Sequence, residues 1–251
     1  HNLEIKGEDG KTKLNVYLVD SLTATLDGTC DHVHENQLEW YKNTRDRLKE
    51  ENGDYVPSIV FQHIPVEEIY ELLMEVPQGT PNSARGYRQW EGKFFSVNPE
   101  RVKIDNRTFI GETPSVPKEN GGQFEVMNEK GDVMAMFFGH DHNNSFVGEY
   151  KGMKMGYTQG CGFNVYGPGR KRGVRIFDFQ ETNPVDFTTT TLTVDDLDDF
   201  KITKKVKHGF YTYAPTSVDA VKLIAKKYVL PVAGAVATVA TIGSLIKKKI
   251  K

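Results

Sequence analysis

The sequence predicts an α/β fold. Two apolar runs in the first third of the chain are each followed by a segment whose apolar residues recur at helical spacing. A third apolar run comes later, after another short helical segment. Alternation of strands with helices is typical of α/β domains. With 251 residues, the chain is long enough for one large domain or two small ones.

The first strand is expected at residues 13–21 (KLNVYLVDS), a β-branched, apolar run that ends in a polar loop. A helix is expected at residues 34–52. There Leu38, Tyr41 and Leu48 share one face, and charged residues fill the others.

The next strand and helix follow directly. Residues 57–65 (PSIVFQHIP) read as a strand that is ended by Pro65. Residues 66–76 (VEEIYELLMEV) have apolar side chains at helical spacing and predict a second helix. The segment from 77 to 105 is irregular and rich in Gly, Pro, Arg and aromatic residues, as expected of a functional loop or an insertion.

The second half of the chain changes in character. Residues 121–131 predict a short helix that leads into the third apolar strand, DVMAMFFG. After Asn143 the sequence predicts short antiparallel strands joined by glycine turns. These strands are expected within residues 146–160, 172–180 and 186–194.

Composition excludes some classes of function. The formal net charge is −2, so the chain has no overall basic field of the kind that binds nucleic acid, and no nucleic-acid partner is expected. The two cysteines, Cys30 and Cys161, are too few for a disulfide scaffold, although they could form one bridge.

The C-terminal end of the sequence predicts a membrane anchor. Residues 229–246 carry no charge and are just long enough to span a bilayer, and residues 247–251 (KKKIK) are basic. A buried or amphipathic terminal helix is the alternative. We therefore expect a domain at 1–200, a juxtamembrane linker at 201–228, a transmembrane helix at 229–246 and a basic tail.

Lysines lie on both sides of this span. Those after it slightly outnumber those before it, which favours a cytoplasmic tail and an extracellular or lumenal globular part.

Three of the seven histidines are candidate metal ligands. His140 and His142 follow the third apolar strand in the string GHDH, and Gly139 would let the backbone bend there. In extended backbone the two rings would point the same way. His63 lies late in another strand, and sites in α/β sheets gather at strand carboxyl ends. We expect the three side chains to converge on a metal site. The alternative interpretation is that they are solvated histidines in loops.

Two other segments are weaker candidates. CDHVH (30–34) combines a thiol, a carboxylate and imidazoles, but it lies in a polar loop without a second Cys/His cluster at zinc-finger spacing, so a loop near the cleft is favoured. The glycines of residues 156–169 fit neither the P-loop nor the dinucleotide pattern, and predict tight turns.

Several of these segments resemble, in order, the calcineurin-like metallophosphoesterase superfamily, and in particular its purple-acid-phosphatase-like branch. The resemblance covers roughly residues 1–180 and rests on the segments HNLEIKG…KLNVYLVDS, ENQLEWYK, VFQHIPVEEI, GDVMAMFFGHDHNNSFVGEYKGMKMGYTQGCGFNVYG and RGVRIFDF.

The resemblance implies a two-metal hydrolase of phosphate esters on an α/β/β/α sandwich. It implies that His63 and His140 share one ion and that His142 binds the other, the metals being Fe, Zn or Mn. Two such ions clamp the ester and activate a water molecule.

The family's earlier motifs, D-x-H, G-D-x-x-D and G-N-H-D/E, do not occur in this sequence. Family order would place them before residue 1, so we expect the C-terminal half of the catalytic domain, with no confident catalytic residue of its own. Such a fragment is expected to hydrolyse little. The alternative is a catalytically inactive, membrane-anchored surface or interaction module that keeps the fold. A nuclease is disfavoured because no basic stripe with interleaved aromatics occurs.

Overall fold

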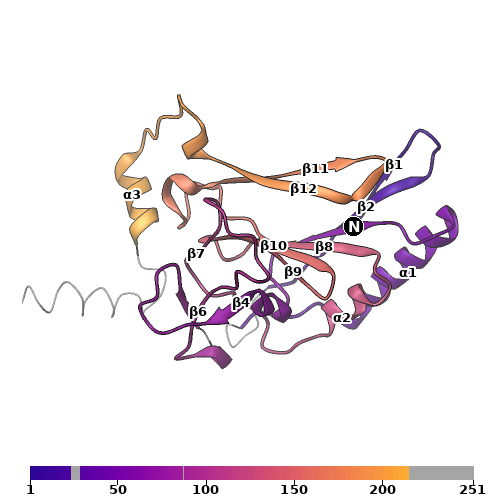
Figure 1. Ribbon diagram of the computed structural model, residues 1–251, viewed down its shortest axis with the longest axis horizontal. Helices are drawn as coiled ribbons and strands as arrows, with labels where there is room; N and C mark the ends of the chain where they lie inside the picture. Colours follow the sequence, from indigo (N-terminus) through magenta and orange to yellow (C-terminus); the bar gives the residue numbers. More distant parts are fainter. Residues whose placement is uncertain (24–28, 87, 215–251) are drawn as a thin grey trace, which may run out of the picture.

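The computed structural model describes residues 1–23, 29–86 and 88–214, and a seven-stranded sheet forms its centre (Figure 1). The strand order is β1-β2-β3-β8-β10-β9-β7. Neighbours among β2, β3, β8 and β10 are parallel, and the remaining pairs are antiparallel. The strands are β1 Asn2–Lys6, β2 Thr12–Leu18, β3 Ser58–Gln62, β7 Phe109–Ile110, β8 Val133–Phe138, β9 Asn144–Tyr150 and β10 Met153–Tyr157. This mixed sheet, with its helices, confirms the α/β class.

Smaller elements complete the fold. The other strands are β4 Leu73–Glu75, β5 Ala84–Arg85 and β6 Phe94–Val97, which form a three-stranded sheet, and β11 Gly173–Gln180 and β12 Asn183–Thr193, which form a hairpin. The α-helices are α1 Glu35–Asn52, α2 Gln123–Asn128 and α3 Lys205–Tyr213. The 3₁₀ helices are η1 Glu67–Leu72, η2 Arg88–Trp90, η3 Gly169–Lys171 and η4 Val194–Asp196.

Both faces of the central strands of the large sheet are buried. Helices α1 and α2 lie on one side of it and the β11–β12 hairpin on the other (Figure 1). On β8, Val133 and Met136 belong to the core on the helix side, whereas Phe137 belongs to the core under the hairpin. There the ring centroids of Phe137 and Phe177 are 4.6 Å apart. Burial on both faces explains why β8 reads as an unbroken apolar run.

Most of the predicted elements are confirmed. The helix expected at 34–52 is α1, and the helix expected within 121–131 is α2. The three apolar strands are β2, β3 and β8, and the late glycine-rich strands form the antiparallel pairs β9–β10 and β11–β12.

The helix predicted at 66–76 is wrong. Residues Glu67–Leu72 form a 3₁₀ helix, and Leu73–Glu75 then continue as strand β4, which pairs with β6. Ile69 and Leu72 are fully buried, so the apolar spacing correctly marked core positions. Pairing with β6 provides ladder hydrogen bonds that replace the helical ones, and tertiary context here overrides the local pattern. The segment 77–105, expected to be irregular, includes β5, β6 and η2.

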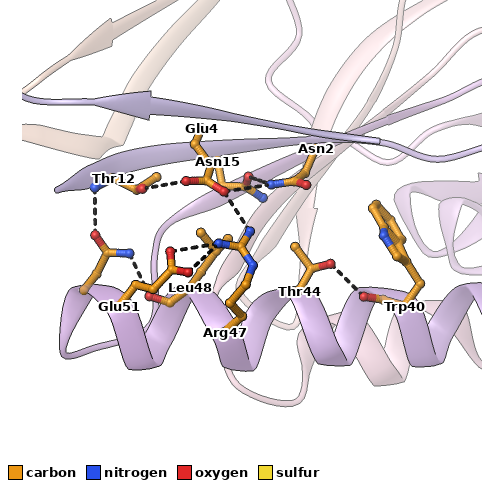
Figure 2. A network of polar contacts seen from close by, with 10 residues as sticks. Asn2, Glu4, Thr12, Asn15, Trp40, Thr44, Arg47, Leu48 and Glu51 are labelled. Atoms are coloured by element: carbon orange, nitrogen blue, oxygen red, sulfur yellow. Dashed lines mark hydrogen bonds and ion pairs between the residues drawn. The ribbon is translucent and has the colours of Figure 1, made fainter. Parts of the chain in front are cut away.

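Helix α1 is held to the sheet edge by charged and amide side chains (Figure 2). Arg47 donates hydrogen bonds to Glu4 at 2.7 Å and to Glu51 at 2.8 Å. On the sheet, Asn2 donates to Asn15 at 3.0 Å. The ion pair between α1 and β1 therefore links elements that are far apart in sequence.

No helix in the described part of the chain is long and apolar enough to cross a membrane. The predicted span at 229–246 and the basic tail lie outside the described residues. Helix α3 falls within the stretch predicted as a linker.

A buried hydrogen bond between Tyr41 and Asp132 gives a test of how α1 is docked. The Tyr41 hydroxyl lies 2.9 Å from both carboxylate oxygens of Asp132, and both residues are buried. We expect Tyr41→Phe to lower the free energy of unfolding by about 1–3 kcal/mol, because a buried carboxylate loses its donor. Urea unfolding measures this.

Tyr55→Phe is the matched control, since the Tyr55 hydroxyl makes no hydrogen bond within the described part of the chain. Equal stability of the two variants would contradict the role assigned to the buried bond.

Candidate functional site

Two parallel strands that lie side by side end at the same edge of the large sheet. In β3 and β8, Gln62 lies opposite Phe138. Just beyond the strands, the Gly139 amide donates a hydrogen bond to the His63 carbonyl at 3.2 Å. His63 and the loop after β8 are therefore brought together by strand pairing.

His63 and His140 are in direct contact. Nδ1 of His140 lies 3.2 Å from Nε2 of His63, and the rings are nearly perpendicular. Two nitrogens bound to one tetrahedral ion at ordinary bond lengths lie about 3.3 Å apart. The separation of these two nitrogens therefore suits two ligands of a single ion.

The loop after β8 is not extended, contrary to the sequence-based expectation. His140 has a φ of 62°, in the left-handed region, and the Asp141 amide donates to the Gly139 carbonyl at 2.7 Å. The bend thus falls at His140 and not at Gly139. A left-handed residue that is not glycine costs about 1–3 kcal/mol and is often found at functional sites.

Glycine at 139 has a different purpose from the predicted one. A Cβ atom at this position would lie 3.2 Å from Nδ1 of His63. That distance is tighter than ordinary contact, so the missing side chain lets the His63 ring lie against the loop.

His142 is held separately from the other two histidines. Its Nδ1 lies 2.9 Å from the Tyr166 carbonyl oxygen, and its ring stacks on Tyr166 with centroids 4.5 Å apart. Because a carbonyl only accepts, Nδ1 carries a proton, and the neutral form of the ring then has its lone pair on Nε2, as in histidines that bind metal. Gly160 leaves room for this ring: a Cβ there would lie 2.9 Å from Cβ of His142.

The aspartate between the two histidines anchors the loop. Asp141 is 2% exposed, and its Oδ2 accepts from the Tyr157 hydroxyl at 2.6 Å and the Ser115 amide at 3.1 Å. Burial raises the pKa of Asp141, and the hydrogen bond from Tyr157 opposes that rise. These bonds hold the carboxylate within the core and so fix the loop that carries His140 and His142.

The surroundings of His63 favour a neutral ring. Partial desolvation lowers the pKa of His63, and the charges of His140 and His142 lower it further. A neutral imidazole is the form that binds metal.

Cys30 also reaches this edge of the sheet. Its buried Sγ lies 3.9 Å from Nε2 of His140. The CDHVH segment was predicted to be a loop near the cleft of the candidate metal site. Cys30 of this segment lies beside His140, one of the candidate ligands. His32 and His34 instead lie against Asp31, at 3.6 and 3.2 Å.

Sequence reasoning missed Glu112, which lies in the long segment before α2. Its carboxylate accepts from the Asn143 amide at 2.8 Å and from the Tyr166 hydroxyl at 3.2 Å. It therefore supports both the end of the histidine loop and the tyrosine under His142. Burial raises the pKa of Glu112 to about 7. No motif surrounds this residue, so its place could only come from the fold.

The three histidines could supply only part of a metal site. The His63–His140 pair suits one ion, and His142 offers a further nitrogen. Across the described part of the chain, however, no group of three or more His, Cys, Asp or Glu side chains is arranged to hold a metal. Asp141 and Glu112, the nearby carboxylates discussed above, are engaged in hydrogen bonds. A complete two-metal site is therefore not formed by these residues alone.

Comparison with known proteins identifies relatives, although no family model matches the chain. The protein named "probable inactive purple acid phosphatase 14" of Arabidopsis thaliana is 31% identical over 197 residues, which cover 72% of this chain and 42% of that protein. "Probable inactive purple acid phosphatase 29" of the same plant is 28% identical over 193 residues, 70% of this chain and 42% of that protein. The chain thus spans less than half the length of these relatives.

The raised pKa of Glu112 predicts a pH dependence of stability. Between the ordinary value of 4.5 and about 7, the unfolded chain loses this proton while the folded chain keeps it. Wild-type stability should therefore fall across this window by up to about 3 kcal/mol from this group. In Glu112→Gln that loss should disappear. The free energy of unfolding of the variant should therefore rise relative to that of wild type between pH 4.5 and pH 8.

Urea unfolding at the two pH values measures the difference. Glu8→Gln, which changes an exposed glutamate, is the control, and its stability relative to wild type should change little between the two pH values. A constant difference between Glu112→Gln and wild type at both pH values would refute this assignment.

Proposed function

Because the chain belongs to the purple-acid-phosphatase-like branch of the metallophosphoesterase superfamily, we propose that it provides part of the metal-binding domain of a phosphoester hydrolase. The observation that carries this proposal is the contact between His63 and His140 at the ends of adjacent parallel strands. The layering of helices, sheet and hairpin is compatible with half of an α/β/β/α sandwich.

The three histidines would divide between two ions. His63 and His140 would hold one, and His142 would reach the second through Nε2. When bound, such ions supply Lewis acidity and lower the pKa of a bound water molecule. Iron, zinc and manganese all accept imidazole, so these ligands alone do not select the metal.

The remaining residues of the site would keep the ligands oriented. The Tyr166 carbonyl fixes the tautomer of His142, and Asp141 holds the loop through Tyr157. Outer contacts of this kind change metal affinity by about 10–100-fold in known sites.

The activity of these residues alone should be low. Three neutral imidazoles do not balance the charge of two divalent ions, and the described residues provide no bridging carboxylate. We therefore expect strong hydrolysis of phosphate esters only in a protein that supplies the missing ligands.

A catalytically inactive interaction module is the second candidate. The names of the relatives call those proteins probably inactive. Metal binding distinguishes the two, because a module that has lost its site has no reason to keep affinity at the histidine pair.

We further propose that residues 229–246 hold the protein at a membrane, with the globular part on the extracellular or lumenal side. The support is the sequence: this stretch has no charged residue and is flanked by lysines.

Zinc binding by the purified chain tests the proposed site. Calorimetry should show Zn²⁺ binding whose affinity falls at least about tenfold in His63→Ala and in His140→Ala, since each removes a ligand. His34→Asn is the control: it removes a histidine of the loop before α1 and supplies a residue that suits the start of a helix. Turnover of p-nitrophenyl phosphate should be low throughout.

Zinc affinity that is the same in all these variants would support the inactive module. Strong turnover with two tightly bound ions in this chain alone would contradict the expected incompleteness.

Two charges within the proposed anchor should release the protein from membranes. Each aspartate near the centre of a spanning helix costs about 2.5–3.5 kcal/mol, so Val236→Asp with Val239→Asp should abolish stable insertion. After expression in cells, the wild-type chain should stay in the pellet on alkaline carbonate washing, and the double variant should not. Val206→Asp, at a position that is 89% exposed, is the control. Wild-type protein in the wash would refute the anchor.

A further inference from the structure

A cleft lies between the β11–β12 hairpin and the antiparallel end of the large sheet. Its volume is about 310 Å³, within the range of small-molecule sites. Residues from β9, β10, both hairpin strands and the segment before β7 line it. None of the three candidate metal-binding histidines does, so this cleft is separate from the candidate metal site.

The walls of the cleft are mostly basic. Five cationic side chains line it, against two acidic ones, Asp105 and Glu149. The cationic residues are Arg101, Lys103, Arg107, Lys154 and Arg175. An excess of positive charge within a hollow attracts anions.

Three of these cations form no direct ion pair. Arg101 pairs with Glu71, and Arg107 pairs with Asp196. By contrast, Lys103, Lys154 and Arg175 form no ion pair with any residue in the described ranges. No carboxylate therefore holds these three groups in direct contact, although Glu149 lies opposite Lys154 in the β9–β10 ladder and the charge of Asp105 acts on Arg175.

Arg175 is the most strongly constrained of the three. Its guanidinium donates to the Tyr157 carbonyl at 3.0 Å, and to the hydroxyls of Ser145 and Thr189 at 3.4 Å each. Its Nε is buried and has no hydrogen-bond partner within the described part of the chain. Burial lowers the pKa of Arg175 to about 10. A buried guanidinium that only neutral groups contact is costly unless an anion joins it.

A second unsatisfied group lies in the same wall. Thr191 on β12 is 5% exposed, and its hydroxyl has no partner among the described residues. The neighbouring Thr189 and Thr190 also line the cleft. Hydroxyls beside cations are the ordinary donors to phosphate oxygens.

Apolar surface completes the cleft. Phe146, Val147 and Phe187 line it, and the Lys154 ammonium lies 4.5 Å from the centroid of the Phe187 ring. A ligand could therefore place an anionic group near the cations and a carbon skeleton against the rings.

We propose that this cleft binds a soluble small molecule that carries a phosphate monoester, through Arg175, Lys103 and Lys154. A dianion with three terminal oxygens matches one guanidinium, two ammonium groups and the threonine hydroxyls better than a carboxylate does. The proposal does not depend on the hydrolase function, because it uses neither metal nor the histidines.

Calorimetry on the full chain in EDTA tests the proposal, with glucose 6-phosphate as the probe. Without metal, the histidine site cannot contribute through an ion. Wild type should bind, and Lys103→Met and Lys154→Met should each weaken binding about tenfold. Lys6→Met is the matched control, since it removes one exposed lysine that does not line the cleft and should leave affinity unchanged.

Arg175→Lys keeps the charge but loses the planar fork, and it should also weaken binding. If that variant fails to fold, the two lysine variants decide. The double variant His63→Ala, His140→Ala should bind like wild type, so failure of the proposed metal site leaves this result unchanged.

Four outcomes would overturn the proposal. One is no binding by wild type at millimolar probe. Another is a loss of affinity in Lys6→Met equal to that in the two cleft lysine variants, which would show a general charge effect. A third is an affinity for sulfate equal to that for glucose 6-phosphate, which would point to an unselective anion site. The last is binding to vesicles of phosphatidic acid without binding of glucose 6-phosphate, which would point to a lipid ligand.

Discussion

Parallel pairing of β3 with β8 is the constraint on which the rest of the fold depends. Both strands are buried, and each presents one set of side chains to the helices and another to the hairpin. Because the pairing is parallel, the two chains leave the sheet at the same edge. A slip of one residue would exchange the two apolar faces and separate His63 from the loop after β8.

Burial on both faces also explains where the polar groups are found. The helix side contains Tyr41 with Asp132, and the hairpin side contains Arg175 against the sheet. In the first case a tyrosine satisfies the buried carboxylate. In the second, the guanidinium donates hydrogen bonds only to neutral groups, and the charge of Asp105 acts on it without a direct ion pair. The two sides of one sheet therefore differ in how their buried charge is balanced, and the unbalanced side faces a cleft.

Much of the fold could be predicted from sequence because its strands are strongly apolar and its glycine turns are frequent. The placement of His63 near His140 followed from their positions at strand ends. The bend at His140, the stacking of His142 on Tyr166 and the role of Glu112 could not be predicted, because they depend on contacts between distant segments. Residues 66–76 show the same limit: Ile69 and Leu72 are buried as their spacing indicated, but β6 determines that Leu73 begins a strand.

The left-handed backbone at His140 also bears on how this position can vary during evolution. Apart from glycine, the residues that tolerate this conformation best are asparagine, aspartate and histidine. All three have side chains that can bind a metal. The backbone alone thus favours glycine and these ligand-like residues at the position, even in a copy of the domain that has lost its ions. A histidine at this position records the shape of the loop as well as its chemistry, so its presence in a sequence is weaker evidence for a working metal centre than the histidine at 63.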